Sequence, residues 1–138
     1  MRLWDAIMAG AVLTGAVLAG AQFVRAQDRV MVTLPDLSAL TRQEAERLTR
    51  DLARADVISA NCPGYDISNG EWALVNGAGD QLATALGLDP TTYERNFYGP
   101  AFDLLDDPAS CDRYGPEVAP LIARLVGLGG TTGPAAGN

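Results

Sequence analysis

The sequence contains no histidine and no lysine, and only two of its 138 residues are cysteine. The lack of histidine removes the commonest acid–base side chain in catalysis and excludes a catalytic cysteine–histidine pair. A structural zinc site needs four cysteine or histidine ligands, and only two cysteines are available. All ten basic residues are arginine, a bias typical of GC-rich bacterial genomes. These absences favour a non-catalytic protein that holds no cofactor and no metal.

The chain is also short of positive charge, with a net charge of −7. Its arginines are interspersed with acidic residues, so no basic patch forms. Phosphate groups are bound by clustered basic side chains, and an acidic chain repels nucleic acid and anionic lipid surfaces. We therefore expect no nucleic-acid partner. The length fits one domain.

The first 26 residues have the three-part plan of a secretory signal peptide. Arg2 provides the positive start, and an uncharged run of 16 residues extends from Ala6 to Ala21. Two small-residue cleavage sites follow, at Ala19-Gly20-Ala21 and at Val24-Arg25-Ala26. Residues 1–26 are therefore predicted to be a signal peptide, and the mature protein is predicted to be periplasmic or extracellular.

The alternative for this segment is an uncleaved anchor helix in the inner membrane. The uncharged stretch reaches Val24 if Gln22 is tolerated. Ala11, Gly15 and Ala19 recur every four residues, a stripe that lets membrane helices pack closely. The run is nevertheless shorter than the roughly 20 residues that a membrane-spanning helix needs. Contact with the membrane is expected only through residues 1–26, and only if they are retained.

Cys62 and Cys111 are predicted to form a structural disulfide. An exported chain enters an oxidising compartment, where disulfides form and persist, and two cysteines allow one intramolecular pairing. Their separation of 49 residues is too large for a Cys-x-x-Cys redox motif. Closing a loop of this length stabilises the fold by roughly 4 kcal/mol in the chain-entropy model.

The rest of the chain divides into an arm, a helical domain and a tail. Residues 27–40 are predicted to be a linker or loosely held arm, because Pro35 ends any short strand there. Residues 41–128 carry the signals of four helices. Residues 129–138 are glycine-rich and are predicted to be disordered. The predicted fold class is all-α, a small four-helix bundle stapled by one disulfide.

The first predicted helix begins at Thr41, which forms a capping-box pattern with Glu44, and it ends near Asn61. Glu46 and Arg50 have the spacing of an ion pair on the solvent side. The apolar residues that recur on one face are Ala45, Leu48, Leu52, Ala55 and Ile58.

The second predicted helix begins at Ser68 with another capping box, completed by Glu71. Its predicted buried stripe consists of Trp72, Val75, Gly79, Leu82 and Leu86. The third begins at Asp89-Pro90, a cap residue followed by a proline at the first helical position. A kink or break is predicted at Gly99-Pro100.

The fourth predicted helix runs from roughly Pro116 to Leu128. Its buried side is formed by Val118, Leu121, Ile122 and Leu125. Cys111 is then expected to precede this helix, as Cys62 follows the first. The disulfide is expected to tie together the two ends of the unit formed by the second and third helices.

Two clusters resemble chemical sites, and each has a simpler structural explanation. Asp103, Asp106, Asp107 and Asp112 are clustered as calcium ligands often are. They lack the spacing of an EF-hand loop, and Asp107 before a proline suits a turn. Glu71 next to Trp72 resembles the catalytic acid and the sugar-stacking aromatic ring of a glycosidase. A glycosidase needs two carboxylates at a fixed separation. The capping box already explains Glu71, and the apolar stripe of the second helix explains Trp72.

The aromatic residues of the third helix supply the predicted binding face. Tyr93, Phe97, Tyr98 and Phe102 are too many to be buried on one helix face. We interpret Tyr98 and Phe102 as lining a groove for a partner or an apolar ligand. The alternative is that a small domain buries its aromatic residues on two sides of a broken helix. The neighbouring Glu94 and Asp103 favour a basic or neutral partner.

We therefore expect a small exported helical protein that binds a partner protein or a small apolar ligand. In outline the chain resembles the small periplasmic acid-stress chaperones, which are exported helical domains of similar size with one disulfide closing a comparable loop. The resemblance concerns layout, and no functional residue is carried over from it. It implies chaperone activity as an alternative. A further alternative is an accessory subunit that an uncleaved N-terminal helix anchors to a membrane complex.

Overall fold

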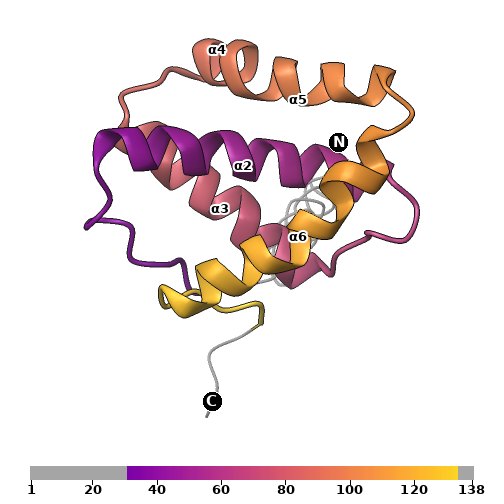
Figure 1. Cartoon of the computed structure of the whole chain (residues 1–138). Coiled ribbons are helices and arrows are strands. Elements are labelled where there is room, and N and C mark those ends of the chain that lie inside the picture. Colours follow the sequence, from indigo (N-terminus) through magenta and orange to yellow (C-terminus); the bar gives the residue numbers. More distant parts are fainter. Residues whose placement is uncertain (1–30, 134–138) are drawn as a thin grey trace, which may run out of the picture.

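The computed structural model describes residues 31–133, which contain helices and connecting segments but no β-strand (Figure 1). The elements are α2 (Arg42–Asn61), α3 (Asn69–Ala85), α4 (Pro90–Tyr93), the π-helix η1 (Glu94–Tyr98), α5 (Gly99–Asp103), the 3-10 helix η2 (Leu104–Asp106) and α6 (Ser110–Gly127). The predicted all-α fold is confirmed for these residues. The predicted signal or anchor helix lies outside them.

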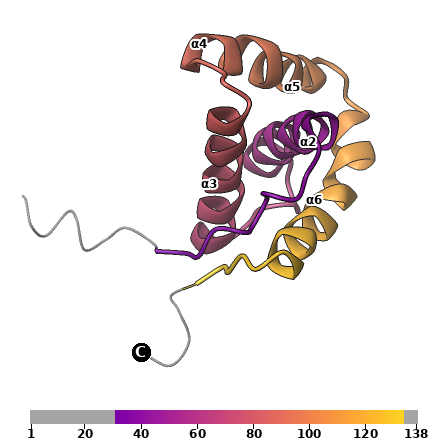
Figure 2. The same cartoon turned by 90° about the vertical axis from the view of Figure 1, so that its left-hand side faces the viewer.

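Helix α2 is the central element of the fold. It packs against α3 and α6, and η1 and α5 also contact it, so that its neighbours surround it on several sides (Figure 2). The apolar stripe predicted for this helix is buried. The core continues into α3 and α6, and its largest buried side chains include Leu48, Leu52, Ile58, Leu74, Leu82 and Leu125.

Both predicted capping boxes form. The Oγ1 atom of Thr41 accepts from the backbone N–H of Glu44, and the Glu44 carboxylate accepts from the backbone N–H of Thr41. Ser68 and Glu71 repeat this arrangement at the start of α3. Each box satisfies two backbone donors that the helix itself leaves free. These local interactions fix where α2 and α3 begin.

The solvent-side ion pair predicted in α2 differs from the observed one. Glu46 pairs with Arg42, at 3.4 Å from Nε to Oε1, rather than with Arg50. The guanidinium of Arg50 instead lies 5.7 Å from the centre of the Phe97 ring. A cation over an aromatic face is attracted by the ring quadrupole, so Arg50 connects α2 with the helix packed above it.

The buried face of α3 differs from the predicted stripe at one end. Leu74, Val75, Ala78 and Leu82 are buried, whereas Trp72 is 51 % exposed. The prediction that Trp72 belongs to the core is therefore wrong. Trp72 lies in the first turn of α3, at the edge of the apolar face, where no other described element covers it fully.

The third helical segment, from α4 to η2, remains helical across Gly99-Pro100. The expected irregularity takes the form of the π-helix η1, directly before the proline. Here the N–H of Gly99 donates to the carbonyl of Glu94, five residues back. Pro100 has no N–H and cannot continue an ordinary α-helical ladder, and a π-turn is a common way to absorb such an interruption. The segment is distorted without being broken.

Helix α6 begins at Ser110, earlier than the predicted start near Pro116. Pro116 and Pro120 therefore lie inside the helix, and both are exposed. Each proline removes one backbone hydrogen bond. Because both lie on the solvent side, water can bind the carbonyls that lose their partners. Cys111 is consequently in the first turn of α6 and not before it.

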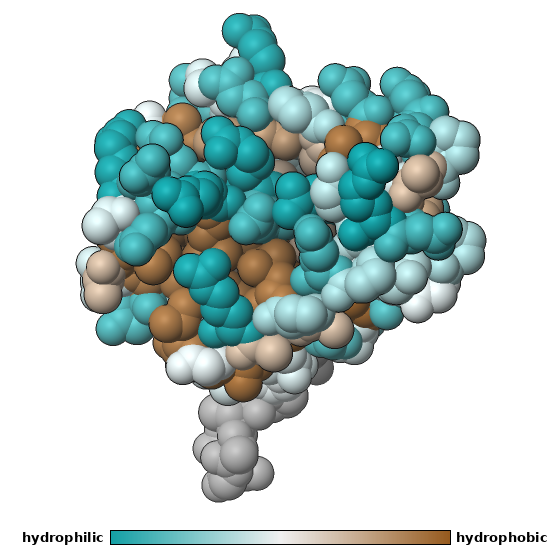
Figure 3. Space-filling model, viewed as in Figure 1, coloured by the Kyte–Doolittle hydropathy of each residue, from teal (hydrophilic) through white to brown (hydrophobic). Residues whose placement is uncertain are grey.

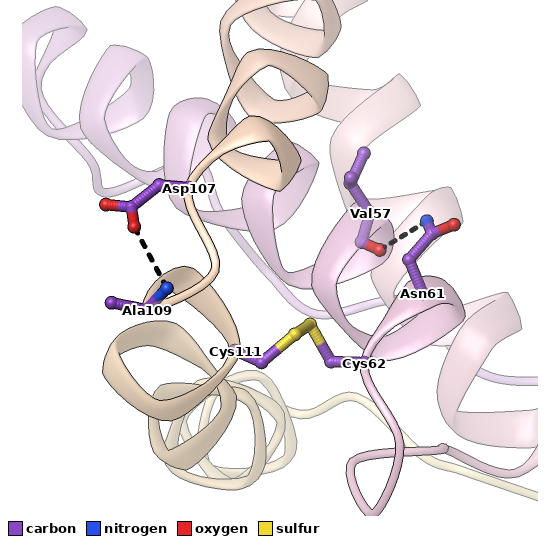
Figure 4. Close-up of a disulfide and its surroundings, with 6 residues drawn as sticks. All are labelled: Val57, Asn61, Cys62, Asp107, Ala109 and Cys111. Carbon is purple, nitrogen blue, oxygen red and sulfur yellow. Dashed lines mark hydrogen bonds between the residues drawn. A yellow bond between two sulfur atoms is a disulfide. The ribbon is translucent and has the colours of Figure 1, made fainter.

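The disulfide between Cys62 and Cys111 forms as predicted, with the two Cα atoms 5.5 Å apart (Figure 4). Cys62 directly follows α2 and is buried. Near it, the side chain of Asn61 donates to the carbonyl of Val57 at 2.7 Å. On the other side, the backbone N–H of Ala109 donates to the Asp107 carboxylate at 2.9 Å. The bond thus joins the end of α2 to the start of α6.

The described part of the N-terminal arm is held by the C-terminal segment. The backbone N–H of Asp36 donates to the carbonyl of Leu128. The N–H of Thr33 donates to Oγ1 of Thr131, and the N–H of Thr131 donates to the carbonyl of Thr33. Leu37 is buried in the core. These contacts differ from the expectation of a loose arm at residues 31–37 and of a disordered tail at residues 129–133.

Candidate functional site

The predicted binding face is only partly present. The hydroxyl of Tyr98 points into the fold and donates to Oδ2 of Asp56 at 2.8 Å. Phe102, in contrast, is 50 % exposed, and Glu94 and Asp103 are exposed as predicted. Tyr98 therefore connects helices, and the outward-facing part of the predicted face consists of Phe102 with its acidic neighbours.

Asp56 is the centre of a small polar cluster between α2, α3 and η1. Its Oδ2 atom accepts from Tyr98 and also from Nδ2 of Asn76 at 3.0 Å. The Tyr93 ring lies against Tyr98 edge-to-face, with centroids 5.4 Å apart. Burial raises the pKa of Tyr98, and the Asp56 carboxylate raises that pKa further. Burial likewise raises the pKa of Tyr93. These half-buried side chains hold three elements together.

A groove lies between α2 and α6. Its volume is about 320 Å³, within the range of known binding sites. Ala55, Val118 and Leu121 supply apolar lining, and Tyr114 adds an aromatic ring. On the face seen in Figure 3, hydrophobic surface is exposed between the positions of α2 and α6 and hydrophilic residues border it.

Arg54 is fixed at one side of this groove. Its guanidinium lies 3.1 Å from Asp51 and 3.0 Å from Glu117, and it stacks 4.7 Å from the centre of the Tyr114 ring. The Arg54 side chain is only 27 % exposed, so these contacts are less screened by water than those of a fully exposed pair. Arg54 thereby holds α2 and α6 at the spacing that leaves the groove open.

The charged side chains that line the groove balance one another. They are two arginines, Arg54 and Arg124, and two carboxylates, Asp51 and Glu117. The other described residues contain five arginines and thirteen carboxylates. The groove lining therefore carries a formal charge of 0 and the remainder of residues 31–133 a charge of −8. The described chain is acidic, but the lining of the groove is neutral.

A second hollow, of about 380 Å³, lies under the arm, between the start of α2 and the end of α3. Its apolar lining comes from Leu37, Leu40, Leu82 and Leu86, among others. Gln81 donates to the carbonyl of Pro35 at 3.3 Å, while its Oε1 atom is buried without a partner among the described residues. This lining suits a small apolar ligand.

In the two clusters that resembled chemical sites, Asp107 and Glu71 have structural roles. Asp107 accepts from the Ala109 N–H in the turn before α6, as its position before a proline suggested. No group of three or more acidic or cysteine side chains that could hold a metal ion occurs within residues 31–133. Glu71 completes a capping box.

The sequence patterns did not indicate the groove, because its contacts join distant residues. Arg54 and Glu117 are 63 positions apart, and neither belongs to a motif. The only signal was the assignment of Ala55, Val118 and Leu121 to the apolar faces of the first and fourth predicted helices. In the structure Leu121 is half-buried and lines the groove, so part of the predicted core stripe is accessible surface.

Comparison with known proteins adds one partial match. A family model described as pentapeptide repeats (8 copies) matches residues 2–27. This is less than a fifth of the chain, it lies outside the described residues, and it does not define a family for the protein. No curated protein and no solved structure matches the chain significantly. Among residues 31–133, no helix is both long and apolar enough to cross a membrane.

Proposed function

We propose that the chain is a small exported helical protein that binds a partner in the groove between α2 and α6 and catalyses no reaction. The observation that carries this proposal is the groove itself, with apolar lining, an aromatic ring and a charged rim in a hollow of about 320 Å³. Grooves between two helices commonly accept an apolar anchor from a partner protein, while rim charges set its orientation.

The proposed export rests on two features at different positions in the chain. Residues 1–26 have the plan of a signal peptide, and the bond between Cys62 and Cys111 is of a kind that persists in oxidising compartments. We propose a periplasmic or extracellular mature protein, in which the signal segment is removed and the four helical segments form the disulfide-linked domain.

Binding is a better explanation than catalysis because the charged groups of the groove neutralise one another. Arg54 is held by Asp51 and Glu117, and no histidine occurs in the chain. A catalytic acid or base needs a pKa near the working pH. The large pKa shift among the described residues belongs to Tyr98, whose pKa is raised by burial, and Tyr98 does not line the groove.

An anchored accessory subunit is the second candidate, and the arm favours it. Residues 31–37 are fixed to the domain by the hydrogen bonds of Thr33 and Asp36. Only residues 27–30 separate this arm from the predicted signal segment. If residues 1–26 were retained, the domain would be held close to the membrane. Sequencing the N-terminus of protein from the envelope fraction tests this: a start at Gln27 or Gln22 supports export, and a start at Met1 or Arg2 supports the anchor.

Photo-crosslinking in the native envelope tests the groove. A photoreactive phenylalanine replaces Leu121, which lines the groove, and in a matched control it replaces Ala123, which is exposed on the same helix outside the groove lining. We expect an adduct of defined mass from position 121 and none from position 123. Equal labelling from both positions, or none from 121, would contradict the proposed function.

A further inference from the structure

We infer that the second hollow, under the arm, binds an uncharged apolar small molecule that carries one hydrogen-bond donor, and that Gln81 accepts this hydrogen bond. The inference goes beyond the proposed function, because the hollow and the groove between α2 and α6 have no lining residue in common. Three observations carry it: a buried acceptor without a donor, the apolar wall around it, and charged neighbours that already have partners.

The hollow is lined by small side chains on both of its helices. Ala45 on α2 and Ala85 on α3 belong to the lining, and a methyl group fills little of the space between two helices. The arm supplies a further wall, where Leu37 is buried in the core. The resulting volume of about 380 Å³ is within the range of known small-molecule sites.

The acceptor is one end of the Gln81 side-chain amide. The other end, Nε2, donates to the carbonyl of Pro35 in the arm at 3.3 Å. Because a carbonyl only accepts hydrogen bonds, it determines which end of the amide faces the arm. The remaining Oε1 atom is buried and has no donor among the described residues. Burial of an acceptor is unfavourable unless a donor reaches it.

The position of Gln81 distinguishes it from the other buried polar atom of this kind. Oγ of Ser110 is also buried without a partner among residues 31–133, but Ser110 lines neither of the two hollows described above. Gln81 lines the second hollow. Since its Oε1 atom is shielded from water, the ligand's donor has to reach it beneath the arm, beside Pro35.

The charged residues of the lining favour a ligand without charge. The carboxylate of Asp36 accepts from both the N–H and the hydroxyl of Ser38. Nε of Arg42 lies 3.4 Å from the Glu46 carboxylate. A charged ligand would have to displace one of these partners or stay unpaired in apolar surroundings, which is unfavourable. The donor of the ligand is therefore a neutral hydroxyl or N–H group.

An ordered water is the competing explanation for the Gln81 oxygen. A buried water typically makes about three hydrogen bonds to polar groups around it. The lining of the hollow is mainly apolar, with Leu37, Leu82 and Leu86 among its members, which suits an apolar molecule with a single donor better. The two occupants differ in what a bound probe should prefer, because a water already supplies the donor that a ligand would bring.

Two probes that differ in one donor test the site. 4-Butylphenol carries a hydroxyl group, and 4-butylanisole has the same ring and chain with a methyl ether in its place. Each is titrated into the protein purified from the envelope fraction, and nuclear magnetic resonance shifts of the backbone amides report binding. Gln81→Met keeps a side chain of similar length and removes the acceptor. Gln43→Met, at an exposed position of α2 outside the lining, is the matched control.

We expect the parent protein and Gln43→Met to bind the phenol more tightly than the anisole, by about fivefold or more. The largest shifts should occur at Leu37, Leu82 and Leu86. Gln81→Met should bind the two probes equally, because the apolar lining is kept while the acceptor is lost. A purely structural role of Gln81 would change the affinity for both probes alike and leave the preference for the phenol intact.

A second pair of variants blocks the hollow without changing Gln81. Ala85→Trp places a large ring in the lining, and Thr84→Trp, at the preceding exposed position outside the lining, is its control. Binding of the phenol should be lost in the first variant and retained in the second. Thermal melting shows which variants are folded, and the Ala85 pair decides the location of the site if Gln81→Met does not fold.

Three results would overturn the inference. They are equal binding of the two probes to the parent protein, as an ordered water on Gln81 predicts, a preference for the phenol that persists in Gln81→Met, and an absence of shifts around the hollow with either probe. The proposed function has its own readout in the Leu121 adduct. Failure at the second hollow therefore leaves the groove between α2 and α6 untouched, and the reverse also holds.

Discussion

Tyr98 and Asp56 join the third helical segment to the centre of the fold. The tyrosine hydroxyl donates to Oδ2 of the carboxylate at 2.8 Å, and the same oxygen accepts from Asn76 of α3. One carboxylate thus connects α2, α3 and η1. The π-helix that includes Tyr98 adds one residue to the turn before Gly99, which changes the direction of the side chains and helps Tyr98 to face inward.

Replacing Tyr98 with phenylalanine tests how much its hydrogen bond to Asp56 contributes to the stability of the fold. Tyr98→Phe keeps the ring but leaves Asp56 with one fewer donor, so we expect a loss of about 1.5 kcal/mol in the free energy of unfolding. Urea unfolding followed by circular dichroism gives the value. Tyr114→Phe is the control, since the Tyr114 hydroxyl makes no hydrogen bond to the described residues, and a change within about 0.5 kcal/mol is expected there. Equal losses of stability in the two variants would mean that the hydrogen bond to Asp56 adds nothing to the free energy of unfolding.

The stability of the protein should fall at alkaline pH, in part through the same tyrosine. The pKa of Tyr98 is raised in the folded state from its ordinary value of 10.0, because burial and the Asp56 carboxylate disfavour the phenolate. The unfolded chain therefore loses this proton first as the pH rises. The stabilisation is complete below pH 10 and declines above it. Unfolding measured from pH 8 to pH 11, roughly the range that brackets an unperturbed tyrosine, should show a steeper decline for the parent protein than for Tyr98→Phe. Parallel curves would exclude this contribution.

Removing the disulfide should be the most damaging single change that leaves the helices themselves intact. Replacing Cys62 and Cys111 together with alanine frees the loop that the bond closes. We expect a loss of roughly 4 kcal/mol, which is a large share of the total stability of a small domain. Unfolding of the double variant beside the parent measures it. Thiol labelling of the unfolded, unreduced parent should detect no free cysteine, and two labelled thiols would contradict the pairing.

Much of the fold could be predicted from the sequence where the determining interactions are local or few. The capping boxes of Thr41 and Ser68 need residues only three positions apart, and both form. The disulfide followed from elimination, because two cysteines in an oxidising compartment have one intramolecular partner. The start of α6 was misplaced because Pro116 was treated as a helix start. Two exposed prolines can lie inside a helix when the rest of its face is well packed.

Less of the candidate site could be predicted, because packing between distant helices decides which side chains stay exposed. The sequence placed Tyr98 and Phe102 together on an outer face, and only Phe102 is there. The inward direction of Tyr98 depends on Asp56, which is 42 positions away. Trp72 was placed in the core by its spacing, yet the packed face of α3 begins with Leu74. The groove around Arg54 exists only because α2 and α6 meet.

The close approach of Gly115 to Tyr65 gives a last test of how α6 is packed. A Cβ atom at Gly115 would lie 2.3 to 2.5 Å from atoms of the Tyr65 ring, closer than real contacts allow. In a helix, alanine is ordinarily more stable than glycine by about 1 kcal/mol. At this buried position we expect the opposite sign, with Gly115→Ala losing about 1–3 kcal/mol because the ring must shift.

Gly127 in the same helix is the matched control for Gly115. A Cβ atom there would have nothing within 4 Å, so Gly127→Ala should gain about 0.5 kcal/mol through the smaller backbone entropy of the unfolded chain. Thermal and urea unfolding of both variants measure the pair. The two substitutions are chemically identical and differ mainly in their surroundings, so opposite signs would establish that Tyr65 packs directly on the backbone of α6. A gain at both positions would show that the ring does not occupy this place, and the start of α6 near the disulfide would then have to be packed differently.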